Sequence, residues 1–285
     1  MYEPNNVLDA DYRVNPETGV PERAPSRRKQ SRWRRLLAPL VAAGGVLAKL
    51  KYLLIPLKLL FALPLVAPVL TALISIGAYA WLFGWQFGVG IVALIFVHEM
   101  GHVIMLRRYG VKASAPIFIP FLGAFIGMKQ LPKDALMEAY VGLAGPVLGT
   151  LGAIAAWAVY QANHQPLWLA LTYLGVLLNL FNLLPVPPLD GGRAVAAISR
   201  WIWALGLVGL VALVIWRPEP ILFLIVVFGG MELWAAWKRS RQNASYYQVP
   251  LPQRLTVTAI YFGLALSLGF ALLKLSPMLA AAHVL

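Results

Sequence analysis

Residues 86–106 read QFGVGIVALIFVHEMGHVIML, an apolar run that carries His98, Glu99 and His102 close to its end. A transmembrane helix needs about 20 predominantly apolar residues, so this run is long enough to cross a bilayer. Ionisable side chains inside a span cost roughly 2.5–3.5 kcal/mol each where they are charged, and they are therefore rare and mostly functional. The segment predicts a membrane-embedded helix that carries a chemical site.

The spacing of the two histidines indicates a metal site. Because His98 and His102 are four residues apart, a helix places both imidazoles on one face, where they can share one ion. Glu99 lies about 100° around the helix from His98, within reach of a water on the metal. Zinc lowers the pKa of such a water to about 7, and a carboxylate can then accept its proton. We predict two metal ligands and a general base; polar residues of a helix bundle without chemistry are the alternative.

The composition is that of a membrane protein. Of the 285 residues, 60% are hydrophobic and only 12% are charged, whereas a soluble protein carries about 25% charged residues. The net charge of +13 is gathered in the N-terminal segment and between apolar runs, a positive-inside pattern that argues against nucleic-acid binding. Because there is no cysteine, the ligands of a metal must come from His, Asp or Glu.

We expect an all-α polytopic membrane protein with about seven transmembrane helices. The predicted spans are 64–83, 86–106, 137–160, 167–188, 194–216, 219–237 and 255–275. The predicted organisation is a disordered basic cytoplasmic tail at 1–35, an interfacial or re-entrant segment at 36–62, a membrane domain at 63–275 with its catalytic core at 86–192, and a C-terminal tail at 276–285. Whether 36–62 crosses the membrane is left open.

The basic residues orient these spans. The connections 107–136 and 238–254 are basic, while the connection 161–166, QANHQP, carries no Asp, Glu, Lys or Arg. The positive-inside bias places the two basic connections and the N-terminus in the cytoplasm. We therefore expect a multi-pass protein of a bacterial cell membrane whose N-terminus is cytoplasmic.

A second kind of structure is expected between the second and third spans. Residues 115–132 read APIFIPFLGAFIGMKQLP, which combines β-branched and aromatic residues with regularly placed proline and glycine. This pattern predicts a short β-hairpin rather than a helix. Non-helical backbone at membrane depth is tolerated only where it is buried in protein or lines a wet cavity, so the hairpin is expected beside such a cavity or at the interface.

A third ligand is needed, because catalytic zinc usually has three protein ligands. Asp190 is the best candidate, since it follows three prolines and precedes two glycines in NLLPVPPLDGG, residues 182–192. A span broken there can aim Asp190 at a metal, and the amide of Asn182 can donate to a developing oxyanion. His164 and His283 are expected to be solvated bystanders. The alternative is a proline-kinked span with Asp190 as a helix cap.

These two motifs together resemble the site-2 protease family of intramembrane zinc metalloproteases. The matching positions are His98, Glu99, His102, Asn182, Pro185, Pro187, Asp190 and Gly191. The resemblance implies that His98, His102 and Asp190 bind one zinc ion, that Glu99 is the base and that Asn182 assists the transition state. It also implies hydrolysis of peptide bonds in or near transmembrane segments of membrane-protein substrates, as in regulated intramembrane proteolysis.

The resemblance covers about residues 86–192 and extends to two further features. GLAGP at 142–146 resembles the core of the family, and the hairpin at 115–132 resembles its membrane-associated β element, thought to engage an unwound substrate as an added strand. The connection 107–136 is too short to hold a PDZ domain. We therefore expect a compact member, whose regulator would be a separate protein or the tail itself.

Two other classes of function remain as alternatives. A non-proteolytic membrane scaffold or chaperone could keep zinc for stability, but such a site needs no base, and Glu99 is present. A metal transporter would show repeated halves and several intramembrane acids along a path, whereas one site accounts for nearly all polar residues at depth here. The expected partners are a transmembrane substrate and the lipid bilayer; neither the substrate nor the oligomeric state is predicted.

Overall fold

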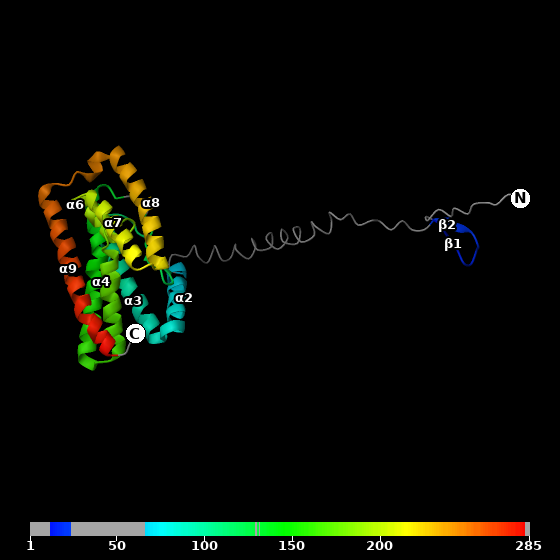
Figure 1. Cartoon of the computed structure of the whole chain (residues 1–285), viewed down its shortest axis with the longest axis horizontal. Coiled ribbons are helices and arrows are strands. Elements are labelled where there is room, and N and C mark those ends of the chain that lie inside the picture. The colour runs from blue at the N-terminus through cyan, green and yellow to red at the C-terminus, as the bar shows by residue number, and fades with distance from the viewer. Residues whose placement is uncertain (1–11, 24–65, 129, 131, 283–285) are drawn as a thin grey trace. The chain divides into compact units, whose positions relative to one another are not determined.

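The structure, a computed structural model, describes residues 12–23, 66–128, 130 and 132–282 (Figure 1). The chain divides into two compact units, Met1–Leu59 and Leu60–Leu285. In the first unit, β1 (Tyr12–Val14) pairs antiparallel with β2 (Pro21–Arg23). This short hairpin lies within the segment 1–35 that was expected to be a tail without regular structure.

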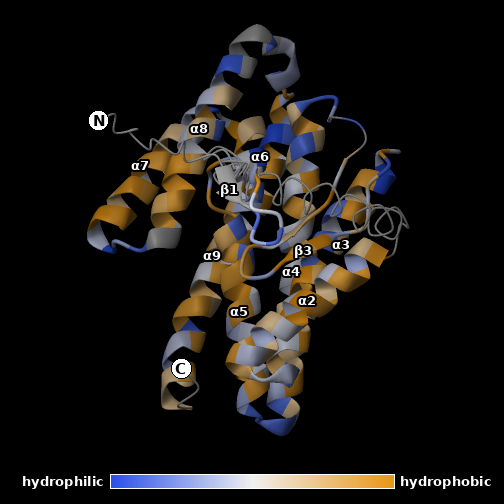
Figure 2. Ribbon diagram, turned by 90° about the vertical axis from the view of Figure 1, so that its right-hand side faces the viewer, coloured by the Kyte–Doolittle hydropathy of each residue, from blue (hydrophilic) through white to orange (hydrophobic). Residues whose placement is uncertain are grey.

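The second unit is a helix bundle built around one central helix. Its helices are α2 (Val66–Phe83), α3 (Trp85–Arg108), α4 (Ala135–Asn163), α5 (Pro166–Asn182), α6 (Asp190–Ile198), α7 (Trp201–Trp216), α8 (Pro220–Gln242) and α9 (Leu251–Ala281), with a 3-10 helix η1 (Ala244–Tyr247) before α9. Helix α4 packs against α3, α5, α6 and α9. Apolar residues run along the outer helices, among them α2, α7 and α9 (Figure 2).

The described residues contain four helices that are long and apolar enough to cross a membrane, α2, α3, α4 and α9. Seven spans were predicted, and each contains a helix, but seven transmembrane helices are not confirmed. Helices α5 and α7 have only 17 and 16 residues, about 25 Å of helix against a hydrocarbon core of about 30 Å. Helix α8 is longer but ends in the basic sequence KRSRQ.

Several observed helices begin or end at other residues than the predicted spans do. The span 167–188 stops as helix α5 at Asn182, because the prolines that follow cannot continue a helix. The span 194–216 is divided into α6 and α7 by Ser199 and Arg200. Helix α9 continues past residue 275 to Ala281. The segment 36–62 lies outside the described residues.

The β-hairpin predicted within 115–132 is confirmed. Strand β3 (Ile117–Ile119) pairs antiparallel with β4 (Gly123–Phe125), in the register Ile117 to Phe125. The turn between them holds Phe121 at a φ of 65°, a conformation that non-glycine residues rarely adopt. The hairpin is therefore a defined element between α3 and α4, with its chain reversal at Phe121.

Two side chains of α2 hold the hairpin. The backbone N–H of Phe118 donates to Thr71 Oγ1 at 3.2 Å, and that of Phe121 donates to Tyr79 OH at 3.1 Å. Thr71 and Tyr79 are eight residues apart and so lie on the same face of α2. This polar stripe satisfies strand and turn donors that an apolar helix would leave unpaired.

The close packing of α3 on α4 depends on small residues. A Cβ atom at Gly101 of α3 would overlap the carbonyl oxygen of Ala144 and would lie 2.9 Å from the Cα atom of Gly145, both on α4. Small residues at helix contacts let backbones approach closely, which is a principal source of helix association in membranes. The Gly101 contact therefore sets how near α3 lies to α4.

Replacing Gly101 with alanine should destabilise the bundle, because the added methyl group meets backbone atoms that cannot rotate away. Overpacking of this kind typically costs about 1–3 kcal/mol. Gly77→Ala is the control, since nothing lies within 4 Å of a Cβ at that position of α2. Thermal unfolding in detergent should show a lower Tm for Gly101→Ala alone; equal Tm values for the two variants would contradict this packing.

Candidate metal centre

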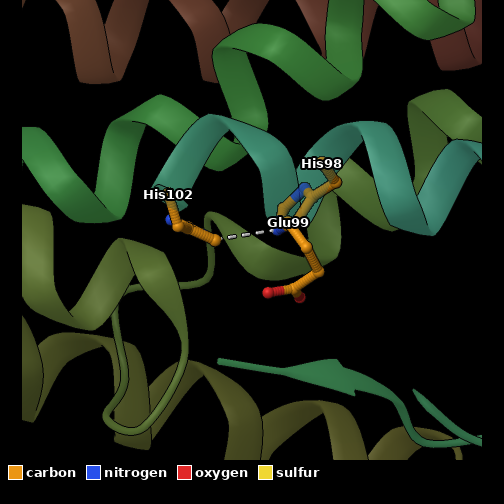
Figure 3. Close-up of side chains that lie close together, drawn as sticks. All are labelled: His98, Glu99 and His102. Atoms are coloured by element: carbon orange, nitrogen blue, oxygen red, sulfur yellow. Dashed lines mark hydrogen bonds between the residues drawn. The ribbon is translucent and has the colours of Figure 1, made fainter. Parts of the chain in front are cut away.

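The three ionisable residues of the HEMGH segment lie in the C-terminal half of α3. Their side chains project from the helix into the same region, as Figure 3 shows. His98 is 3% exposed, and Glu99 and His102 are each 7% exposed. Their nearest ligand atoms all lie within 4.8 Å of one another. The segment therefore concentrates three polar groups in the protein interior, as its sequence predicted.

Asp190 joins this group from the first turn of α6. Its Oδ2 atom lies 3.1 Å from His98 Nε2 and 3.2 Å from His102 Nε2. The two Nε2 atoms are 3.3 Å apart. Asp190 is also buried, at 8% exposure. The fold thus brings together the three side chains predicted as ligands, although 92 residues separate His98 from Asp190.

The triangle of these three atoms fits a tetrahedral zinc site. Ligands about 2.0 Å from a tetrahedral centre are about 3.3 Å from one another, close to the three edges of 3.1, 3.2 and 3.3 Å. The set is two imidazoles and one carboxylate, which is a known donor set for catalytic zinc with its fourth position open. Of the four polar side chains, Glu99 stands outside this triangle and remains available as a base.

Hydrogen bonds to the far side of each ring fix the histidine tautomers. His102 Nδ1 is 2.7 Å from the carbonyl oxygen of Val141, which can only accept, so Nδ1 carries the proton. His98 Nδ1 is 2.8 Å from Asn179 Oδ1, and it donates there in the same way. Both rings therefore present an unprotonated Nε2 lone pair toward the shared point, as a metal ligand must.

Asn179 on α5 is a site residue that the sequence analysis missed. Its side-chain Nδ2 donates to the carbonyl oxygen of Gly175 at 2.6 Å, which turns its Oδ1 toward His98. It is 1% exposed. The available signal was a second polar residue in the run NLFN, three positions before Asn182. Its role depends on the contact between α5 and α3, which the sequence does not display.

Space for the ligand atoms comes from Gly145 on α4. A Cβ atom there would overlap the ring of His102 and would lie 2.9 Å from His98 Nε2. A side chain at this position would thus occupy the region where the two Nε2 atoms meet. Gly145, the second glycine of GLAGP, is therefore required both by the candidate metal site and by the packing of α3 on α4.

The irregular segment 183–189 carries the chain from α5 to Asp190 and is held at both ends. Tyr261 OH of α9 donates to the carbonyl oxygen of Leu183 at 2.7 Å. Trp203 Nε1 of α7 donates to the carbonyl oxygen of Gly192 at 2.6 Å. Backbone groups freed by the prolines are expensive to bury without partners. The first bond satisfies a carbonyl that Pro187 leaves without a helical donor, and the two bonds together hold the chain on either side of Asp190.

The other residues singled out in the sequence lie elsewhere. Asn182 is partly buried and donates from Nδ2 to the carbonyl oxygen of Leu178 at 3.0 Å. Within the described part of the chain it makes no hydrogen bond to His98, His102 or Asp190. His164 is exposed at the end of α4, with a left-handed φ of 53°, and His283 lies outside the described residues.

The two asparagines of α5 should respond differently to substitution. Asn179→Ala removes the acceptor that orients His98, and loss of such a partner typically weakens metal binding by about 10- to 100-fold. Asn182, three residues further along the same helix, makes no hydrogen bond to His98, His102 or Asp190 in the described part of the chain, so Asn182→Ala should bind zinc as the unmodified protein does. Zinc affinity measured by competition with a chelating dye checks both, and equal weakening in the two variants would contradict the assignment.

Comparison with known proteins finds the same region. A family model described as Peptidase family M50 matches residues 86–165 and 153–206. A zinc metalloprotease of Methanocaldococcus jannaschii is 35% identical over 109 residues, 36% of this chain and 31% of that protein. The putative zinc metalloprotease Rip3 of Mycobacterium tuberculosis is 34% identical over 142 residues, 45% of this chain and 35% of that protein.

A third relative is more distant. Stage IV sporulation protein FB of Bacillus subtilis is 26% identical over 106 residues, 36% of each chain. The matched region spans about a third of the length of these curated relatives. The region that the family model matches contains α3 and α4, which carry His98, His102 and Val141, and the α5–α6 segment that carries Asp190. Over this region the chain resembles members of peptidase family M50, the site-2 protease family.

Proposed function

We propose that the protein is a membrane-embedded zinc metalloendopeptidase that hydrolyses peptide bonds in or near transmembrane segments of other proteins. The observation that carries the proposal is the buried triangle of His98 Nε2, His102 Nε2 and Asp190 Oδ2 beside the Glu99 carboxylate. Relatives named zinc metalloproteases support zinc as the ion. The three side chains would hold one ion per chain.

The side chains around this triangle have separate roles in hydrolysis. Bound zinc supplies Lewis acidity and makes water a stronger acid. Glu99 takes the proton of the attacking water at its carboxylate and returns it to the departing amine. Asn182 uses one amide hydrogen for Leu178 and keeps a second donor for the oxygen of the scissile carbonyl as charge develops there.

The position of the site favours a substrate that lies in the membrane. The histidines belong to α3 and their supports Val141 and Gly145 belong to α4, and both helices are candidate spans. A helical substrate must unwind first, because its carbonyl groups are hydrogen-bonded and shielded. Strand β4 pairs only with β3 among the described residues and packs near α3. An extended substrate segment could therefore add to this hairpin as a strand.

The proposed orientation puts the site near the cytoplasmic face. Val141, which holds His102, lies in the second turn of α4, next to the basic connection 107–136. With that connection and the N-terminus in the cytoplasm, cleavage would occur near the inner side of a bacterial cell membrane. A cut at this depth releases a cytoplasmic fragment of the substrate, which suits regulated intramembrane proteolysis.

Glu99→Gln should abolish cleavage while zinc remains bound, because the amide cannot accept a proton and Glu99 is not one of the three ligands. Quantitative proteomics of membranes from cells that carry either form should show uncut substrates accumulating with Glu99→Gln. Metal analysis of the purified proteins should give one zinc per chain in both.

Asp190→Ala is the companion variant for this experiment. Loss of one ligand should lower both zinc content and cleavage, so the two variants separate metal binding from proton transfer. Full cleavage by Glu99→Gln would exclude Glu99 as the base. Unchanged substrate levels in both variants, with zinc lost only from Asp190→Ala, would instead indicate a non-proteolytic zinc scaffold.

The orientation can be tested with single cysteines, because the natural sequence has none. Gln165→Cys, in the uncharged connection after α4, should react with a membrane-impermeant maleimide in intact cells. Gln248→Cys, between η1 and α9, should react only after permeabilisation. Both native side chains are exposed in the structure, so accessibility reports the side of the membrane. The reverse labelling pattern would invert the proposed topology.

A further inference from the structure

A cavity of about 610 Å³ adjoins the segment that carries Asp190. Pro187 and Pro188, just before Asp190, and Gly192 and Arg193, just after it, form one part of its wall. The remaining wall comes from the start of α4 and from α7, α8 and η1. The volume falls within the range of about 300–1,000 Å³ that is typical of ligand pockets. The metal centre and this cavity therefore share a segment of backbone.

The acidic groups of the cavity are already engaged. Tyr246 OH donates to Glu138 Oε2 at 2.7 Å. Burial and the nearby Glu138 carboxylate raise the pKa of Tyr246, so this phenol keeps its proton and remains a donor. Glu232 also interacts with a neighbouring group. Both carboxylates of the cavity thus have partners within the protein.

The cationic groups of the cavity have no such partners. Arg193 is partly buried and makes no hydrogen bond or ion pair with any residue that the structure describes. The same holds for Lys133, which is exposed at the rim. Two cationic and two acidic side chains line the cavity, and among the described residues Arg193 and Lys133 are the two that make no hydrogen bond or ion pair. Their N–H donors are therefore available to an anion.

Arg193 lies close to the metal centre. A Cβ atom at Gly142 of α4 would lie 2.9 Å from the carbonyl oxygen of Asp190 and 3.1 Å from Arg193 Cβ. The preceding residue, Val141, binds His102. Two successive residues of α4 thus contact the metal centre and the base of the Arg193 side chain.

We propose that this cavity is a carboxylate-binding subsite for the polypeptide substrate, with Arg193 as the group that receives the carboxylate. The inference rests on the proposed proteolytic function. A guanidinium presents paired N–H donors that match a carboxylate, and a partly desolvated setting strengthens that pairing. The carboxylate belongs either to an acidic side chain beside the scissile bond or to the C-terminus that hydrolysis creates.

A polypeptide fits the position of this cavity better than an anionic lipid does. The wall combines the segment around Asp190 with residues of α4, α7, α8 and η1. A peptide chain with one bond at the metal centre has neighbouring residues within reach of this wall. Pro187, Pro188, Trp203 and Tyr247 add apolar surface for the rest of such a chain.

The test is peptide binding to the zinc-loaded Glu99→Gln protein, which avoids turnover. The probes are three N-acetylated octapeptides of alanine and leucine with one central variable residue: glutamine with a C-terminal amide, glutamine with a free C-terminus, and glutamate with a C-terminal amide. At least one carboxylate peptide should bind about tenfold or more tightly than the neutral peptide, as measured by thermophoresis. The peptide that gains affinity identifies the source of the carboxylate.

Substitutions assign that preference to Arg193. Arg193→Gln should reduce the affinity of the preferred peptide to that of the neutral one, and Arg193→Lys should keep part of the difference. Arg217→Gln, which removes an arginine that does not line this cavity, should leave the affinities of all three peptides unchanged. Zinc content and Tm are measured for each variant, so loss of folding is separated from loss of binding.

Three results would overturn the proposal. Equal affinity for all three peptides would show that the cavity does not select a carboxylate. A preference that survives Arg193→Gln and disappears when zinc is removed would assign the carboxylate to the metal. Displacement of the preferred peptide by short-chain phosphatidylglycerol, but not by a second peptide, would make the cavity a lipid site. Because binding needs no catalysis, a protein that binds as expected but never cleaves would refute only the proposed function.

Discussion

The contact between Asp190 and the two histidines is the interaction on which the rest of the structure depends. Three ionisable side chains are buried at 3–8% exposure, with their ligand atoms 3.1–3.3 Å apart. Such a cluster is expensive to bury unless every polar atom has a partner. Val141 and Asn179 supply partners on the far sides of the rings, and a metal ion would supply the shared partner at the centre. Four helices must therefore meet at one place.

This convergence explains where the bundle uses small and irregular residues. The histidines can approach α4 only because Gly145 leaves room for their rings and Gly101 lets the backbones come close. Asp190 can reach them only because the prolines end α5 before the helix passes the site. Tyr261 bonds the Leu183 carbonyl, which Pro187 leaves without a helical donor, and Trp203 bonds the Gly192 carbonyl in the first turn of α6. Glycines and prolines, which weaken individual helices, thus allow the helices to meet at the candidate metal centre.

Two features adjoin the elements that carry the candidate metal centre, the β3–β4 hairpin and the cavity beside the Asp190 segment. On one side of α3 the hairpin β3–β4 is tied to α2 by Thr71 and Tyr79 and offers an unpaired strand edge among the described residues. The segment that positions Asp190 also forms part of the wall of a cavity that Arg193 lines. Under the proposed function, the hairpin and this cavity are the two surfaces expected to contact the substrate.

The sequence by itself determined the features that depend on residue spacing and composition within one segment. Helical spacing identified His98, Glu99 and His102, the proline–glycine pattern singled out Asp190, and residues 115–132 were correctly predicted to form a hairpin. Hydropathy located the helices, and four of them are long and apolar enough to span a membrane among the described residues. Only the tertiary structure decided that Asn179 rather than Asn182 contacts His98, and that Arg193 lies beside the site. The physical reason is that periodicity shows which face of a helix a residue occupies, whereas its partners depend on how α3, α4, α5 and α6 pack.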